Sequence, residues 1–289
     1  MPSLWPLIFL FFLLGVSAGM LDVAMNSQAV MVEKQLGKPI MTSFHAVFSI
    51  GMMLGAVGGS LFIKLGTGLF IHFGIVAGLS LVTVFIARYY LIHDKPQLKT
   101  DEEPAFRLPN AAMVSIGVIA FCSMLGEGAM ADWSTNYMEN ISDADPALAP
   151  IGLSAFALAM TIGRVLGDGA RIKFGDRLLM IACGLTATFG LCLTVIFIHP
   201  FAVIAGLFIV GIGLSAIVPI AYSIAGHTKD LPPGVGLAMV TTVGYSGFLF
   251  GPPIIGFLAD WQSLRIAFLL VVFLFVVMTG LSYFYKPKL

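Results

Sequence analysis

The chain has 289 residues, of which 58% are hydrophobic and only 10% are charged, and its formal net charge is zero. Soluble domains carry about 25% charged residues, so this composition excludes a water-soluble globular protein and favours a polytopic membrane protein. A balanced charge provides no basic surface, and the sequence therefore gives no support for nucleic-acid binding.

Nine apolar stretches are each close to the ~20 residues that a helix needs to cross the core of a bilayer. In chain order they cover residues 4–32, 41–63, 67–90, 110–138, 150–172, 178–198, 201–226, 234–258 and 264–285. The charged and proline-rich segment 93–109 separates the third stretch from the fourth and is predicted to be a linker. The predicted fold class is an all-α membrane protein with nine transmembrane helices.

The positive charges predict the orientation of these helices. When the nine stretches cross the membrane alternately, all the Lys and Arg residues fall on one side except Lys64 and Arg265. Loops rich in Lys and Arg stay in the cytoplasm. The C-terminus and the linker are therefore predicted to be cytoplasmic, and the N-terminus of this chain is predicted to lie outside.

An internal repeat relates the first three stretches to the last three. A shift of 196 positions superimposes three pairs of glycines without a gap: Gly15 on Gly211, Gly51 on Gly247 and Gly55 on Gly251. Parallel repeats of six spans joined by a cytoplasmic linker are a known transporter plan. Because the second half begins near residue 110, the shift predicts that the first half begins about 85 residues before Met1, with room for three more spans.

Four motifs carry a resemblance to a known family. They are GxxxGxxDxxMN at 15–26, SFHAVFSIGMMLGA at 43–56, GEGAMADWSTNY at 126–137 and GRVLGDGARIKFGDR at 163–177. In these motifs the chain resembles the major facilitator superfamily, and within it the fucose-permease-like branch of bacterial proton-linked transporters. The resemblance implies helices 4–12 of a twelve-helix fold, without its first three helices. Residues 1–92 would then form a partial N-terminal bundle (helices 4–6), and residues 110–289 the C-terminal six-helix bundle (helices 7–12).

Asp22 and Asn26 share one face of the first helix because they are four positions apart. An ionisable residue deep in a span is costly, so it usually faces a cavity or a partner. By resemblance, Asp22 matches the acidic residue that lines the central cavity of the family. The hypothesis is that Asp22 takes up a proton while Asn26 hydrogen-bonds a polar substrate; alternatively, Asp22 ties helices together. His45, early in the second stretch, is either a proton relay or a structural residue.

A second polar group lies in the fourth stretch. Glu127 is its more interior acid and a candidate for substrate or proton binding, because the resemblance places this helix at the cavity. Trp133 either stacks on a sugar-like face or belongs to an aromatic belt at the membrane interface. Asn136, near the outer end of the helix, is either a substrate contact or an interfacial anchor. The sequence leaves open whether Tyr222 and Tyr245 also line the cavity.

Charged residues surround the loop between the fifth and sixth stretches. They are Arg164, Asp168 and Arg171, with Gly167 beside them. An acid at a helix end beside cytoplasmic arginines can hold neighbouring helices together in one access state and release them in the other. These four residues are therefore predicted to act in gating, unless they are simply the ordinary positive charge of the cytoplasmic side.

Enzyme classes receive little support. Residues 15–19 match GxSxG, but no strand precedes them as a hydrolase requires, and the HExxH, P-loop and GxGxxG motifs are absent from the sequence. The prediction is therefore a non-enzyme without a cofactor or a metal site. A channel is less favoured, because the acids are isolated rather than repeated.

The resemblance implies a proton-coupled secondary transporter of a small polar solute, with a sugar-like metabolite favoured, that works by alternating access as a monomer in the bacterial inner membrane. The direction of transport stays open, so an exporter is also possible. An inactive fragment would fit the sequence as well, and so would a non-transporting sensor or scaffold built on a transporter fold.

Overall fold

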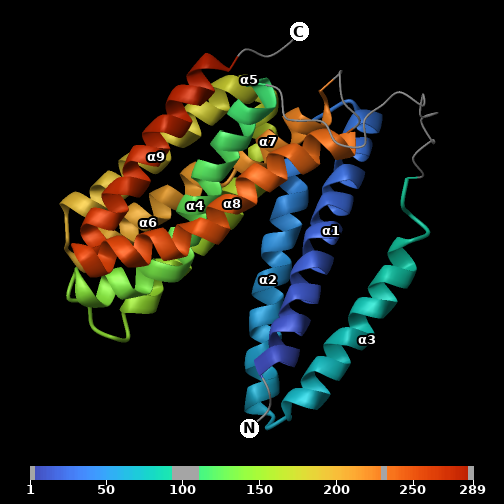
Figure 1. The fold of residues 1–289 in the computed structure, drawn as a ribbon, viewed down its shortest axis with the longest axis horizontal. Helices are drawn as coiled ribbons and strands as arrows, with labels where there is room; N and C mark the ends of the chain where they lie inside the picture. Colours follow the sequence, from blue (N-terminus) through green and yellow to red (C-terminus); the bar gives the residue numbers. More distant parts are fainter. Residues whose placement is uncertain (1–3, 93–110, 229–232, 286–289) are drawn as a thin grey trace. The chain divides into compact units, whose positions relative to one another are not determined.

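The computed structural model describes residues 4–92, 111–228 and 233–285, and every regular element in these ranges is an α-helix (Figure 1). The helices are α1 (Leu4–Leu36), α2 (Met41–Lys64), α3 (Leu69–Ala87), α4 (Ala111–Asn140), α5 (Ala149–Ile196), α6 (Pro200–Leu214), α7 (Ile217–Gly226), α8 (Pro233–Trp261) and α9 (Leu264–Phe284). The prediction of an all-α membrane fold is confirmed. The predicted linker 93–109 lies outside the described residues.

The nine predicted spans map onto these helices, and the division into separate helices differs at two places. Within the described residues, seven helical segments are long and apolar enough to cross a membrane when α5 is counted once and α6 is joined to α7, and α2 contains a shorter apolar stretch. Helix α5 holds two predicted spans, which meet at Gly175. This residue has a φ of 74°, a left-handed conformation that glycine adopts without strain. The chain therefore bends at Gly175, and α5 has two arms.

The seventh predicted span is broken in its middle. Helix α6 ends at Leu214, and α7 begins at Ile217. Pro219 lies in the first turn of α7, where its missing N–H costs little. In an unbroken helix its ring would collide with the carbonyl one turn earlier, so the break falls at Ser215 and Ala216. The hydroxyl of Ser215 donates to the carbonyl of Ile212 at 2.7 Å.

Several helix ends follow ordinary capping rules. Pro200 is the first residue of α6, and a proline also lies in the first turn of α5. At these positions a backbone N–H would have no partner within the helix, so proline is tolerated. Ser263 precedes α9, and its hydroxyl accepts from the N–H of Ile266 at 3.3 Å. These residues determine where the three helices begin.

Contacts divide the chain into two compact units, residues 1–43 with 108–289 and residues 44–107. In the second unit, α2 turns into α3 through Gly66, which has a φ of 65°, and the ring of His72 stacks on Phe62 at 4.3 Å between centroids. The first unit contains α1, the first residues of α2, and α4 to α9. These units differ from the predicted bundles 1–92 and 110–289, and that domain division stays a prediction.

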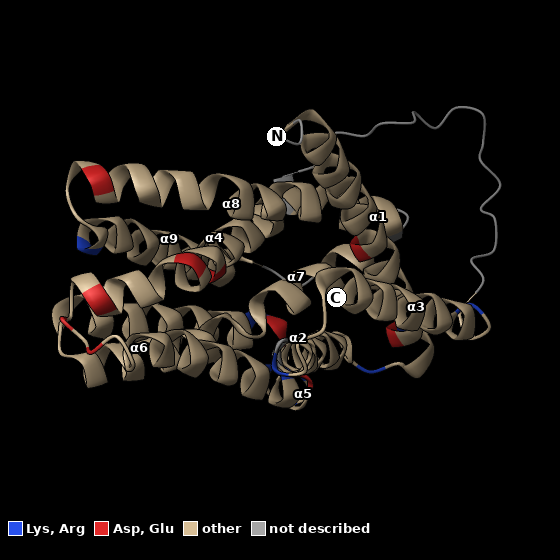
Figure 2. Cartoon of the chain, turned by 90° about the horizontal axis from the view of Figure 1, so that it is seen from below, with Lys and Arg blue, Asp and Glu red and all other residues tan. Residues whose placement is uncertain are grey.

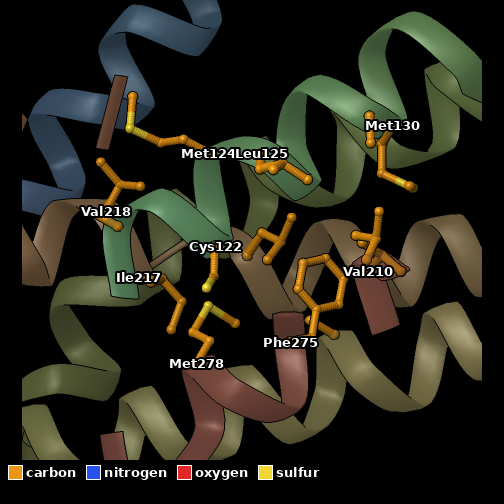
Figure 3. Close-up of a cluster of buried hydrophobic side chains, with 14 of the residues drawn as sticks. Cys122, Met124, Leu125, Met130, Val210, Ile217, Val218, Phe275 and Met278 are labelled. Atoms are coloured by element: carbon orange, nitrogen blue, oxygen red, sulfur yellow. The ribbon is translucent and has the colours of Figure 1, made fainter. Parts of the chain in front are cut away.

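The core of the first unit is apolar and rich in sulfur (Figure 3). Side chains from α4, α6, α7 and α9 meet in it, among them Cys122, Leu125, Val210, Phe275 and Met278, all fully buried or nearly so. Helix α4 lies in contact with α8, α9, α5 and α7. A helix with so many neighbours is buried on most sides, which places its polar residues inside the protein.

Candidate functional site

Charged residues occupy only short pieces of the helices in Figure 2, so an acid in the middle of a helix stands out. Asp22 is such a residue, in the middle of α1. The side-chain amide of Asn26 donates to the Asp22 Oδ1 at 3.1 Å and to the Asp22 carbonyl at 2.9 Å. Asp22 Oδ2 is buried without a hydrogen-bond partner among the described residues. The structure thus brings the two predicted residues together and leaves Asp22 Oδ2 without a partner at hydrogen-bond distance among the described residues, with the Tyr245 side chain as its next polar neighbour.

Two tyrosines from other helices join this acid. Tyr245 of α8 and Tyr222 of α7 both interact electrostatically with Asp22 and with Glu127, and they also interact with each other. Tyr222 is almost fully buried, whereas Tyr245 is 40% exposed. The ring of Tyr245 lies 6.1 Å from that of Phe248. The tyrosines therefore link the acid of α1 to the acid of α4.

Glu127 forms an ion pair with Arg164. The guanidinium Nη2 of Arg164 lies 3.3 Å from Glu127 Oε1, and the Arg164 side chain is only 7% exposed. Arg164 is one of the predicted gating residues, and the structure places it in the middle of the first arm of α5, beside Glu127. Its role in gating stays a prediction. We call the following residues the central polar cluster: Asp22, Asn26, Glu127, Arg164, Tyr222 and Tyr245.

The remaining predicted substrate residues lie apart from these contacts. Trp133 is half-buried, and its ring edge faces Gly256 of α8. Asn136 is exposed, and its carbonyl accepts from the side chain of Asn140 at 3.2 Å. His45 belongs to the second compact unit, where its carbonyl accepts from the Ser49 hydroxyl at 3.1 Å.

Two buried carboxylates cap the N-terminus of α2. Asp168 accepts from the backbone N–H of Thr42 at 3.0 Å and of Ser43 at 2.7 Å. Glu33 accepts from the N–H of Ile40 at 3.0 Å and of Met41 at 3.3 Å. The first N–H groups of a helix have no partner within it and carry partial positive charge, so carboxylates stabilise them. We call Glu33 and Asp168 the α2 cap.

Gly167 makes this cap possible. A Cβ atom at residue 167 would overlap the side chain of Thr42, so only glycine lets α5 approach the start of α2 this closely. The predicted pair Gly167 and Asp168 therefore acts at one place: the glycine provides the space, and the aspartate provides the acceptors.

Arg171 connects the cap to the bend in α5. Its guanidinium donates to Glu33 Oε1 at 2.9 Å and to both carboxylate oxygens of Asp176, which follows the bend at Gly175. The other oxygen of Glu33 accepts a hydrogen bond from the hydroxyl of Ser223 on α7, and His227 Nδ1 lies 3.6 Å from it. One carboxylate thus connects α1, α2, α5 and α7.

Sequence reasoning missed part of this arrangement. Glu33, Asp176, Ser223 and His227 were not predicted as site residues. Arg171 is 138 positions from its partner Glu33, and Ser223 is 190 positions from the same acid, so no local pattern reveals these contacts. The signal available in the sequence for Glu33 was an acid among apolar residues near the end of the first stretch, a few positions before the second stretch begins.

No group of three or more His, Cys, Asp and Glu residues that could hold a metal ion occurs in the described part of the chain. Ion pairs and hydrogen bonds are the interactions that the described residues of the two sites make.

Comparison with known proteins relates the chain to membrane transporters. The family profile described as Major Facilitator Superfamily matches residues 116–288. An uncharacterised MFS-type transporter of Yersinia pestis is 34% identical over 254 residues, which cover 88% of this chain and 66% of that protein. An uncharacterised transporter of Sinorhizobium fredii is 34% identical over 264 residues (90% and 69%), and the membrane protein MosC of Rhizobium meliloti is 32% identical over 278 residues (94% and 66%). The chain thus spans about two thirds of the length of these relatives.

Among solved structures, the fucose:proton symporter FucP of E. coli superimposes with a TM-score of 0.72 at 16% identity, over 94% of this chain and 74% of that one. FucP in its outward conformation gives a TM-score of 0.60 at 18% identity, over 75% and 54%. The similarity at this identity is one of fold.

Proposed function

Because this chain belongs to the Major Facilitator Superfamily, we propose that the protein is a proton-coupled secondary transporter of a small polar solute. It works by alternating access, in which helix bundles rock about a site near the middle of the membrane. The observation that carries the proposal is the central polar cluster, which places ionisable side chains in the middle of otherwise apolar helices.

Asp22 is the proton carrier in this proposal. A charged residue at the centre of a bilayer costs about 2.5–3.5 kcal/mol on insertion scales, so a proton that neutralises the carboxylate lowers the cost of closing the site to both sides of the membrane. Glu127 already has the Arg164 guanidinium at 3.3 Å. The side chains that interact with Asp22 among the described residues, namely Asn26, Tyr245 and Tyr222, are an amide and two phenols without a positive charge. A mobile proton is therefore better placed on Asp22 than on Glu127.

The solute is a sugar-like metabolite in this proposal, and it moves in the same direction as the proton. The support comes from the fold shared with a fucose:proton symporter and from the polar groups beside Asp22. Hydroxyl groups of such a solute can bind the Asn26 amide and the tyrosine hydroxyls, which both donate and accept hydrogen bonds.

The α2 cap is the gate of the proposed transport cycle. It joins α1 and α2 to α5 and α7 through buried carboxylates, so the access state that it stabilises opens only when these bonds break. Lys34 and Lys38 lie at the end of α1 and just after it, and the positive-inside rule assigns this end to the cytoplasm. The proposed gate is therefore cytoplasmic, in a protein of the bacterial inner membrane.

The test is proton-coupled uptake by the purified chain in liposomes, with a pH-sensitive dye inside and a panel of neutral, amino and acidic hexoses outside. Asp22→Asn is expected to abolish uptake driven by a pH gradient while the melting temperature of the variant stays at the wild-type value, which shows a folded protein. Asp132→Asn, an exposed acid on α4, is the matched control. Uptake by the Asp22→Asn variant with an unchanged pH response would refute the proposal.

A further inference from the structure

The two acids of the central polar cluster differ in whether a positive charge lies beside them. Glu127 is paired with Arg164 at 3.3 Å. The side chains that interact with Asp22 among the described residues are Asn26, Tyr245 and Tyr222, and none of them carries a positive charge. We propose that the solute of this protein carries a protonated amine, and that this ammonium binds the carboxylate of Asp22. The inference rests on the proposed transport function and names its substrate class.

The carboxylate of Asp22 has an acceptor to offer. Its Oδ1 accepts from Asn26 at 3.1 Å, but its Oδ2 is buried without a hydrogen-bond partner in the described residues. A buried acceptor that lacks a partner costs about 1–3 kcal/mol, and more when it is charged. An ammonium supplies both a hydrogen-bond donor and a positive charge, so it satisfies both needs of Asp22 at once.

Aromatic rings near this acid favour a cation as well. Tyr245 interacts with Asp22, its ring lies 6.1 Å from that of Phe248, and Tyr222 interacts with both Asp22 and Tyr245. The face of an aromatic ring attracts ammonium groups, and a carboxylate beside aromatic rings is a common way to bind an organic cation. Aromatic side chains in general can also pack against the apolar face of a sugar ring. A sugar-like solute with an amine therefore suits both the aromatic rings and the carboxylate of Asp22.

An acidic solute fits less well. The cationic side chain of the cluster in the described part of the chain is Arg164, and Glu127 already accompanies it. A solute carboxylate would have to displace Glu127 and would then face two acids. A neutral solute needs a separate proton on Asp22, whereas an amine brings its own positive charge. An ammonium takes the place of the proton on Asp22, so an amine solute is exchanged for protons at this carboxylate, in place of the shared direction proposed for a neutral solute.

The experiment measures how fast a hydrophobic carbodiimide activates Asp22 in the reconstituted wild-type chain. It is read by mass spectrometry as loss of the unmodified peptide that contains Asp22, so that amides formed with the amine probes are counted together with the carbodiimide adduct. Glucosamine and ethanolamine are the amine probes; glucose, N-acetylglucosamine and ethylene glycol are their neutral counterparts, and glucuronate is the acidic one. At neutral pH the amines are expected to slow labelling of Asp22 by at least about tenfold relative to the neutral probes. Because the wild-type chain is used, a folding defect cannot mimic this result.

Labelling of another acid separates specific binding from a general effect. The rate at Asp132, which is exposed, is expected to stay the same with every probe. Equal rates at Asp22 with amine and neutral probes, or protection by glucuronate alone, would overturn the inference. If the amines give no protection while Asp22→Asn still abolishes proton-coupled uptake, the proposed function stands and the substrate class is wrong.

Discussion

Removing Asp168 should release the start of α2. Its carboxylate is buried and accepts from the N–H groups of Thr42 and Ser43 at 3.0 and 2.7 Å. A hydrogen bond to a charged group contributes about 1.5–3 kcal/mol, and loss of a capping residue costs about 0.5–2 kcal/mol. The Asp168→Ala variant loses both bonds, so the free energy of local opening at the start of α2 should fall by about 2–4 kcal/mol.

Amide hydrogen exchange reads this free energy directly. A loss of about 2–4 kcal/mol corresponds to exchange that is roughly 30- to 1000-fold faster, because about 1.4 kcal/mol changes an equilibrium tenfold. The measurement is mass spectrometry of the peptide that covers residues 38–46, in detergent or in nanodiscs. Asp168→Asn should show a smaller increase, since its amide oxygen still accepts a hydrogen bond but carries no charge to oppose the helix dipole.

The matched control is Asp132→Ala, which removes an exposed acid from α4 and should leave this peptide unchanged. Exchange in the Asp168→Ala variant at the wild-type rate would contradict the reasoning, because the two N–H groups would then have no need of the carboxylate. A global increase over all peptides would show general destabilisation instead of a local cap.

Three further substitutions test the same region. Gly167→Ala should push Thr42 away at a cost of about 1–3 kcal/mol, visible as faster exchange of the same peptide with Asp168 intact. Gly175→Ala should lower the melting temperature, because a side chain at the φ of 74° and ψ of 165° found there costs about 1–3 kcal/mol; an unchanged melting temperature would argue against the bend. Glu33→Gln should destabilise by about 3 kcal/mol, the lower end for a broken buried ion pair, because Arg171 keeps its second carboxylate partner. A thermal unfolding curve that matches the wild type would contradict this estimate.

The sequence predicted what depends on local spacing. Apolar length indicated the helices, and the four-residue interval placed Asn26 on Asp22, where the hydrogen bond is found. The break between α6 and α7 could also have been predicted from Pro219, which lies just after it. One span was predicted there because the apolar residues are continuous. Gly175, with its left-handed backbone, lies between the two spans that the sequence separated at 172 and 178.

Pairings across the chain were out of reach. Asp168 meets Thr42 over 126 positions, and nothing in either segment specifies the other. Arg164 and Arg171 have the same local setting, yet one pairs with Glu127 in the middle of a helix and the other with Glu33 at its end. Burial and packing of α5 against different neighbours decide between these partners, and a single sequence does not contain that information.

Two glycines related by the predicted repeat also show that spacing alone does not reveal a contact. Gly247 of α8 touches α4, since a Cβ there would lie 2.6 Å from the carbonyl of Phe121. Its repeat counterpart, Gly51, has no described atom within 4 Å of such a Cβ. The spacing of small residues in the two segments is alike, but only a packed neighbour turns a glycine into a contact point.

Two neighbouring residues of the short helix α7 belong to different sites. Tyr222 belongs to the central polar cluster, and the next residue, Ser223, donates to Glu33 of the α2 cap. The break before Ile217 separates this ten-residue helix from α6. Substitutions in α7 are therefore pleiotropic: a change selected for a new solute at Tyr222 also shifts Ser223, and with it the gate. Laboratory evolution of substrate range should accordingly find fewer acceptable changes in α7 than in α8.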